Sequence, residues 1–144
     1  MLSSTCKYAI RAVIYLGYHY EEGKRIGIKQ ISDDLNIPMP FLGKVLQSLA
    51  KKKLLTSNKG PHGGFGLGKE GLKLTLVEIV EAVDGPDVFC NCLIGNHLCQ
   101  DGANSCPVHE QFHSIRQDFV NFFKQETVGE IVAKMSDPND FMRL

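Results

Sequence analysis

The sequence feature that most constrains the fold is a helical pattern interrupted by two prolines, Pro38 and Pro40. Apolar residues recur at helical spacing on both sides of the break: Ile28, Ile31 and Leu35 before it, and Leu42, Val45, Leu46 and Leu49 after it. Proline disrupts the interior of a helix but suits its first turn. The pattern therefore predicts a short helix to about residue 36, a turn, and a second helix that opens at the prolines. This is the helix-turn-helix arrangement, whose second helix enters a major groove.

Two short strand patterns follow these helices, at residues 54–56 and 65–67. The segment between them, SNKGPHGG, contains Gly60, Gly63 and Gly64, which allow the backbone angles of a tight turn. A hairpin directly after a helix-turn-helix predicts a winged helix, with a fold that is mainly α and carries a small β-hairpin wing. An ordinary surface turn is the alternative interpretation of this segment.

The charge of the chain is divided between its two halves. Residues 1–73 contain 12 Lys and Arg against 5 Asp and Glu, a net charge of +7, whereas residues 74–144 contain 4 against 11, a net charge of −7. A basic half favours a nucleic-acid surface, because contacts to phosphates supply much of the affinity for DNA. A solvated basic face is the alternative. We expect residues 1–73 to form the DNA-binding region and residues 74–144 to form a sensor loop, at residues 86–107, and dimerisation helices.

The residues expected to contact double-stranded DNA lie at the start of the second helix and in the hairpin tip. They are Met39, Pro40, Phe41, Gly43 and Lys44 in the helix, and Lys59, Gly60, His62 and Gly63 in the tip. The helix would contact bases in the groove, and the tip would contact phosphate or the minor groove. Phe41 equally suits a place in the core, because it continues the apolar stripe of the helix.

Other helix boundaries follow from capping signals. Ser3 or Ser4 can cap a first helix that presents Ala9, Ala12, Val13, Leu16 and Tyr20 on one face. Thr75 with Glu78, and Thr127 with Glu130, have the spacing of capping boxes, so we expect helices to begin there. Residues 136–144 have the character of a tail.

A long helix is predicted from Pro107, and its apolar residues resemble a coiled-coil seam. Val108, Phe112, Ile115, Phe119 and Phe122 are spaced by four, three, four and three residues. Val120 and Phe123 widen this face beyond what one small domain needs to cover. We therefore expect a homodimer through this helix, with packing inside one subunit as the alternative.

The segment before this helix gathers metal-binding residues. Cys92, Cys99 and Cys106 are each separated by six residues, and His109 follows three positions after Cys106. Three thiolates and one imidazole suit either zinc or an iron-sulfur centre. The residues could also act as metal-free redox thiols, together with Cys90, and Cys90 is an alternative ligand.

The remaining composition narrows the function classes. The chain has no apolar run of about 18 residues and its first residues lack a signal-peptide pattern, so we expect a cytoplasmic protein with no membrane partner. Five cysteines without a secretory signal indicate reduced thiols or ligands rather than a disulfide framework. No phosphate loop or catalytic constellation accompanies them, so we do not expect an enzyme; an electron carrier and a protein-interaction module are the weaker alternatives.

Five blocks of the chain carry a family resemblance. They are KYAIRAVIYL, ISDDLNIPMPFLGKVLQSLAKKKLL, KGPHGGFGL, LTLVEIVEAVDGP and CPVHEQF, in this order. The sequence resembles the Rrf-two family of bacterial transcriptional regulators over nearly its whole length. The resemblance implies a winged-helix dimer built on a long C-terminal helix, with a three-cysteine loop that holds a cluster in the sensing members. A dimer would read two half-sites about one helical turn, or roughly 34 Å, apart, so we expect a pseudo-palindromic operator.

The resemblance favours a 2Fe-2S cluster on Cys92, Cys99, Cys106 and His109, because a histidine follows the third cysteine as in IscR-like members. Zinc is the second choice, and a regulator without a metal is the third. Three departures from the family pattern are visible. The gaps between the cysteines are one residue longer, Lys7 replaces the acidic ligand of NsrR-like members, and Gly43 stands where IscR-like members have a glutamate. The last difference predicts a different operator. We expect a regulator that represses transcription.

Overall fold

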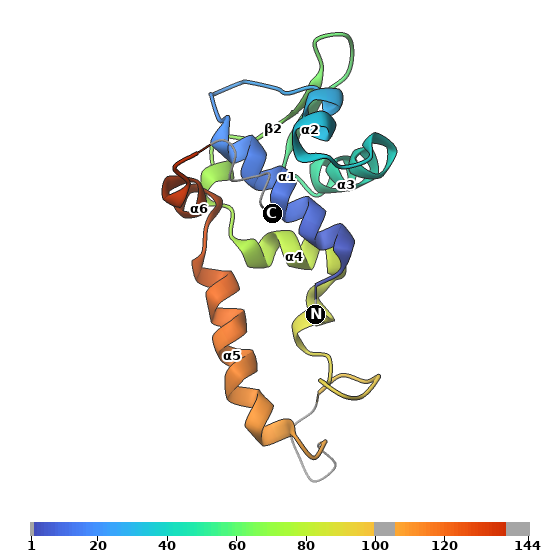
Figure 1. The fold of residues 1–144 in the computed structure, drawn as a ribbon, viewed down its shortest axis with the longest axis vertical. Coiled ribbons are helices and arrows are strands. Elements are labelled where there is room, and N and C mark those ends of the chain that lie inside the picture. The colour runs from blue at the N-terminus through green and yellow to red at the C-terminus, as the bar shows by residue number, and fades with distance from the viewer. Residues whose placement is uncertain (1, 100–105, 138–144) are drawn as a thin grey trace.

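The helix α1 (Ser4–Tyr18) is the element against which most of the others pack, in a computed structural model that describes residues 2–99 and 106–137. Ser3 caps it: its hydroxyl accepts a hydrogen bond from the backbone N–H of Cys6 at 3.0 Å. The predicted apolar face at residues 9, 12, 13 and 16 is buried. Because α2, α3, α4 and α6 all contact α1, this helix joins the N-terminal and C-terminal parts of the chain (Figure 1).

The predicted helix-turn-helix is present as α2 (Ile28–Leu35) and α3 (Met39–Lys51). Asn36 ends α2 in the left-handed conformation, with φ of 52°, a region that asparagine tolerates better than most residues. Ile37 is buried, and its backbone is held by Ser32: the N–H of Ile37 donates to the Ser32 carbonyl at 3.1 Å, and the Ser32 hydroxyl donates to the Ile37 carbonyl at 2.6 Å. The turn is therefore fixed by local bonds and by one core residue.

The wing is a two-stranded antiparallel hairpin of β1 (Thr56–Asn58) and β2 (Gly64–Gly66), with Thr56 opposite Gly66. The first strand begins two residues later than predicted, because residues 52–55 form the turn that connects the end of α3 to the strand. Lys53 adopts a positive φ of 63°, and the N–H of Leu54 donates back to the carbonyl of Leu49. The hydrophobicity of Leu54 and Leu55 thus reflects packing on the core rather than strand pairing.

The segment before α2 also pairs with the wing. Ile26 pairs with Phe65 through two backbone hydrogen bonds of 2.8 and 2.9 Å. This close approach explains Gly64, because a Cβ atom there would lie 2.2 Å from the carbonyl oxygen of Ile26. The direction of the wing is consequently set by a partner 30 or more residues earlier in the sequence.

The short 3-10 helix η1 (Gly71–Lys73) ends the N-terminal half. The C-terminal half contains α4 (Leu76–Asp84), the 3-10 helix η2 (Pro86–Phe89), α5 (His109–Gln125) and α6 (Val128–Lys134). Both predicted capping boxes are present, at Thr75 and at Thr127. The long helix begins at His109 rather than at Pro107, which lies in a turn before it.

The two capping boxes lie next to each other, because Thr75 and Thr127 form a backbone bridge. The N–H of Leu76 donates to the Glu126 carbonyl at 3.0 Å, and the N–H of Val128 donates to the Leu74 carbonyl at 2.8 Å. The C-terminal end of α5 is therefore joined to the start of α4, and α6 returns onto α1. The other end of α5 extends away from the helix-turn-helix, beside the segment that follows α4 (Figure 1).

The expected fold class is confirmed: the described residues are mainly helical and carry a single small hairpin, as in a winged-helix regulator. Within the part of the chain that the structure describes, no helix is both long and apolar enough to cross a membrane.

Candidate functional site

The start of α3 presents an exposed surface. Met39 and Phe41 are large apolar side chains with 45% and 36% of their surface exposed, and Pro40 and Lys44 are also exposed. The ring of Phe41 also packs edge-on against Tyr8 of α1 with a centroid distance of 5.5 Å. Phe41 is therefore partly exposed and partly packed on α1, and its predicted contact with DNA stays a prediction.

Gly43 does not share this exposure. It is buried, and a Cβ atom at this position would lie 3.1 Å from Cδ1 of Ile28 in α2. The absence of a side chain allows α2 and α3 to pack closely at this point. The structure therefore places Gly43 in the packing between the two helices, apart from the exposed residues predicted with it.

The wing tip carries Lys59, Gly60 and His62, which are all exposed. Gly60 has a φ of +102°, which favours glycine. Gly63 is partly buried because the hairpin closes tightly on it: a Cβ atom would lie 2.3 Å from the carbonyl oxygen of Asn58. The two glycines thus shape the tip, while the lysine and the histidine supply the hydrogen-bond donors.

A groove of about 770 Å³ separates the wing from the helix-turn-helix. Its lining includes Lys29 from the first turn of α2, Lys51 from the end of α3 and Lys59 from the wing. Three cations from three different elements therefore border one concave surface. Such an arrangement suits a chain of phosphates, which a lysine contacts as a point charge.

The lysine run at residues 51–53 does not act as one patch. Lys51 borders the groove, whereas the ammonium group of Lys52 donates to the carbonyl of Ala82 in α4. Lys53 adopts the left-handed conformation that ends α3. Only one of the three lysines therefore belongs to the groove.

The cysteine loop starts with a short pairing of its own backbone. Asn91 and Leu98 form an antiparallel bridge, flanked by a hydrogen bond from the N–H of Cys92 to the carbonyl of His97 at 2.9 Å. On the other side of the bridge, the N–H of Cys99 donates to the carbonyl of Cys90 at 2.6 Å. The loop thus brings Cys99 back next to the chain that enters it.

The four predicted ligands come together in two pairs. Sγ of Cys99 lies 3.0 Å from Nδ1 of His109, which is the first residue of α5 and is 92% buried. The side chains of Cys92 and Cys106 are hydrogen-bonded to each other, and the Cys106 thiol also interacts electrostatically with Cys99. The sequence spacing therefore identified two pairs of neighbouring residues.

The thiols of Cys92 and Cys106 have pKa values shifted in opposite directions. Backbone N–H groups of Ile94 and Gly95, the thiol of Cys106 and the charge of Arg116 lower the pKa of Cys92, with the Ile94 contact the largest. Burial, followed by the neighbouring Cys92 and Cys99, raises the pKa of Cys106. Of this pair, Cys92 is consequently the thiol that loses its proton more readily.

These donors fit an iron-sulfur or zinc group in their chemistry, because soft sulfur and imidazole ligands suit both. Among residues 2–99 and 106–137, no three His, Cys, Asp or Glu side chains form a cluster with the geometry of a metal site. The ligand set of Cys92, Cys99, Cys106 and His109 stays a prediction. Residues 100–105, which belong to the predicted sensor loop, lie outside the described part.

The predicted seam of α5 is divided between two directions. Phe119 and Phe123 turn toward η2, where their rings lie 6.0 and 5.6 Å from that of Phe89. In contrast, Ile115 and Phe122 have 60% and 52% of their surface exposed. The seam thus contains one row that packs within the subunit and another that faces outward.

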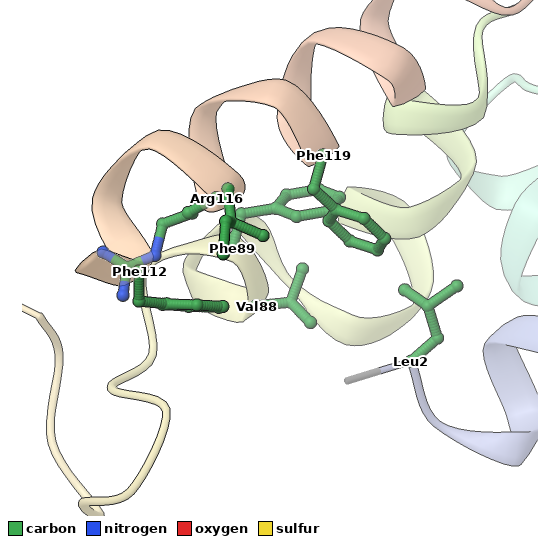
Figure 2. Close-up of a pocket in the computed structure, with 7 residues that line it drawn as sticks. Leu2, Val88, Phe89, Phe112, Arg116 and Phe119 are labelled. Atoms are coloured by element: carbon green, nitrogen blue, oxygen red, sulfur yellow. The ribbon is translucent and has the colours of Figure 1, made fainter. Parts of the chain in front are cut away.

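Between α5 and η2 lies a small apolar cavity of about 50 Å³ (Figure 2). It is lined by Leu2, Val88, Phe89, Phe112, Ile115, Arg116 and Phe119. The guanidinium group of Arg116 stacks on Phe112 at 5.0 Å from the ring centroid and donates to the carbonyl of Asn91 at 3.4 Å. Arg116 therefore connects α5 to the cysteine loop.

Sequence reasoning did not single out Lys29, Asp84 or Arg116. Asp84, at the end of α4, accepts a hydrogen bond from the N–H of Ser3 at 2.9 Å and another from the Ser3 hydroxyl, so it ties α4 to the start of α1. Arg116 follows His109 by seven residues, which places both on the same side of a helix; this spacing was an available signal. The contact of Asp84 is non-local and had none.

Comparison with known proteins places the chain in a family. The model of the Rrf2 family, described as iron-dependent transcriptional regulators, matches residues 2–134. A protein of Aquifex aeolicus classed as a helix-turn-helix transcriptional regulator is 33% identical over 92% of this chain and 91% of its own. The helix-turn-helix transcriptional regulator IscR of Klebsiella pneumoniae is 29% identical over 91% of this chain and 78% of its own.

Solved structures agree on the fold. CymR, described as the global cysteine regulator of B. subtilis, matches with a TM-score of 0.77 and 20% identity, over 94% of this chain and 98% of its own. The IscR of T. potens matches with a TM-score of 0.69 and 20% identity, over 95% of this chain and 93% of its own. The fold of this chain is thus shared with the solved structures of CymR and IscR. The chain belongs to the Rrf2 family of DNA-binding transcriptional regulators.

Proposed function

We propose that the protein is a homodimeric regulator, acting as a repressor, whose affinity for its operator depends on whether Cys92, Cys99, Cys106 and His109 hold a 2Fe-2S cluster. A bound cluster would supply a redox-active centre that oxidants or nitric oxide can damage or remove. The protein's own contribution would be three sulfurs and one ring nitrogen as ligands, which the structure holds as two neighbouring pairs. Such a regulator works in the cytoplasm, where thiols are kept reduced.

The observation that supports the proposal is the pairing of the four side chains two by two near the start of α5. The Cys99 sulfur lies 3.0 Å from the His109 ring, and Cys92 is hydrogen-bonded to Cys106. His109 is buried, so its ring is held in place by the surrounding chain. A bound metal ion or cluster would replace the contact between Cys99 and His109 and the contact between Cys92 and Cys106, each of which otherwise needs a proton between its two partners.

The position of α5 supports a link between the loop and the DNA-binding region. Its first residue is His109, and its C-terminal end is joined to the start of α4 by the bridge between Thr75 and Thr127. Arg116 connects its first half to the loop through Asn91. A change in the order of the loop would therefore bias the position of α5, which is joined to α4, and α4 in turn contacts α1 and α3 of the DNA-binding region.

DNA would be read by residues 1–73. In this proposal the exposed start of α3, with Met39, Pro40, Phe41 and Lys44, enters the major groove, and the wing tip contacts the flanking backbone. Phosphates between them would lie along the groove bordered by lysines from α2, α3 and the wing. Gly43 would act indirectly, by permitting the close packing of α2 and α3.

The dimer would form through residues 74–144, along the outward row of α5. Ile115 and Phe122 are apolar and more than half exposed in a single subunit, which favours coverage by a second copy. Two copies would present two wings and two α3 helices to a pseudo-palindromic operator.

The test is an anaerobic gel shift with cluster-reconstituted and cluster-free protein on duplexes selected from a random-sequence pool. We expect the two forms to differ in affinity by at least about tenfold, which corresponds to roughly 1.4 kcal/mol of coupling. The Cys92→Ala variant is the matched control, because it should behave as the cluster-free form under both conditions. Equal affinity of the two wild-type forms for every selected duplex would overturn the proposal.

A further inference from the structure

Cys90 has no role in the ligand set, yet the fold places it next to one of the ligands. It precedes the bridge between Asn91 and Leu98, and Cys99 follows that bridge on the other strand. The N–H of Cys99 donates to the carbonyl of Cys90 at 2.6 Å. Cys90 and Cys99 are therefore neighbours joined by one backbone hydrogen bond, while at the end of η2 the N–H of Cys90 donates to the carbonyl of Asp87.

The hydrogen bond limits the distance between the two residues. With ordinary backbone bond lengths, an N–H···O contact of 2.6 Å keeps the Cα atoms of Cys90 and Cys99 within about 6.5 Å of each other. Disulfides form between cysteines whose Cα atoms lie roughly 4.4–6.8 Å apart. The single backbone bond keeps Cys90 and Cys99 within the upper limit of this range.

Exposure distinguishes the thiols of Cys90 and Cys99 from the thiol of Cys6. Cys90 is exposed and Cys99 is partly exposed, so both are open to dissolved oxidants. Cys6 is fully buried in α1, where burial and the neighbouring Asp84 raise the pKa of its thiol to about 12. Oxidation is therefore directed to the loop and not to the core.

We propose that Cys90 and Cys99 form a reversible disulfide when the loop holds no cluster and the protein meets a peroxide. The exposed Cys90 sulfur attacks the peroxide, so that an S–O bond forms, the O–O bond breaks and one water leaves. The Cys99 sulfur then attacks the Cys90 sulfur, so that the S–S bond forms, the S–O bond breaks and a second water leaves. The two thiols lose two electrons and two protons, and hydrogen peroxide takes up both.

The consequence rests on the proposed function of the loop. A disulfide would remove Cys99 from the ligand set and from its contact with His109, so the oxidised protein would not accept a cluster. A dithiol reductant would reverse the bond, because thiolates exchange with disulfides. Cys90 would thereby protect a cluster ligand from irreversible oxidation while the site is empty.

The test uses the full-length variant Cys92→Ser/Cys106→Ser, which leaves Cys90 and Cys99 as the only cysteines in the loop. After treatment with hydrogen peroxide and alkylation of free thiols without unfolding, intact-mass spectrometry should show a monomer lighter by two hydrogen atoms and with neither thiol alkylated. The variant that also carries Cys90→Ser should show no such species. Oxygen added to sulfur, or disulfide-linked dimers, in place of the internal bond would overturn the inference.

A second measurement separates this inference from the proposed function. Wild type that has been treated with peroxide should take up at least about tenfold less iron and sulfide than reduced wild type, and Cys90→Ser should keep most of its uptake after the same treatment. Equal loss in Cys90→Ser and wild type would overturn the protective role of Cys90. If reduced wild type binds no iron while the disulfide still forms, the proposed function fails and the disulfide stands.

Discussion

The lysines that border the groove between the wing and the helix-turn-helix give a prediction whose size follows from the structure. Lys51, at the end of α3, and Lys59, in the wing, both line this groove. If each contacts one phosphate, each contributes about 0.9 to the slope of log affinity against log salt concentration. A dimer on a pseudo-palindromic operator makes each contact twice, so one substitution should flatten the slope by about 1.8 and the pair by about 3.6.

The loss of affinity follows from the same relation. At about 0.1 M salt, a change of 1.8 in the slope corresponds to an affinity lower by roughly 60-fold. We would measure it by fluorescence anisotropy with a selected operator duplex, for Lys59→Ala, Lys51→Ala and the double variant. Lys73→Ala is the matched control, because Lys73 pairs with Glu70 at 2.6 Å on η1 and does not line the groove.

The reasoning would be refuted by a particular pattern. If Lys59→Ala and Lys73→Ala had the same salt slope as wild type, the groove would not hold the DNA backbone. If Lys59→Ala lowered the affinity without changing the slope, its role would be structural, and a loss of stability should then appear in thermal unfolding.

Three further predictions concern the dimer and the packing that holds α6. Ile115→Glu should convert the dimer to a folded monomer in light scattering, because Ile115 is 60% exposed, whereas Gln117→Glu should leave the dimer intact; a dimeric Ile115→Glu would contradict the proposed interface. Gly17→Ala should lower the free energy of unfolding in urea by about 1–3 kcal/mol, because the new Cβ would lie 2.6 Å from Val128 Cγ1. Adding Val128→Ala to this variant should relieve part of the loss, and simple additivity of the two changes in the free energy of unfolding would disprove the clash. Hydrogen bonds from Thr127 hold the pKa of the Glu130 carboxyl below its ordinary value of 4.5, so the stabilising effect of this carboxylate is present above pH 4.5 and is lost as the pH falls through the lowered pKa. Glu130→Gln should therefore flatten the dependence of the unfolding temperature on pH in the acid range, and an unchanged profile would speak against this linkage.

Local signals explain why much of the fold could be predicted. Thr75 and Thr127 cap their helices through residues three positions away, so the sequence alone contains both partners of each bond. The turn between α2 and α3 is likewise fixed by Ser32, Asn36 and Ile37, which lie within six residues.

Features that depend on distant partners could not be predicted in the same way. The first wing strand begins at Thr56 because Lys53 ends α3 in a left-handed conformation, and Ile26 sets the direction of the hairpin. The inward row of α5 packs against Phe89, which no periodicity within α5 can reveal.

The candidate site shows the same division. Spacing gave the four residues of the ligand set, and the structure brings them together in two pairs. The pairing of Cys90 with Cys99 depends on the bridge between Asn91 and Leu98, which the turn-forming residues of the loop permit but do not specify. At the start of α3, Gly43 shows that position in a helix does not by itself distinguish a groove contact from a packing contact.

The central claim is that the loop holds a cluster, and its most direct test is anaerobic reconstitution followed by visible absorption and iron, sulfide and zinc analysis. Wild type should contain iron and sulfide in equal amounts, with the content lost in Cys92→Ala, Cys99→Ala and Cys106→Ala and the spectrum altered in His109→Ala. His113→Ala is the matched control, since His113 neighbours His109 on α5 but is not in the ligand set. Colourless wild-type protein, with zinc alone or with no metal, would contradict the account.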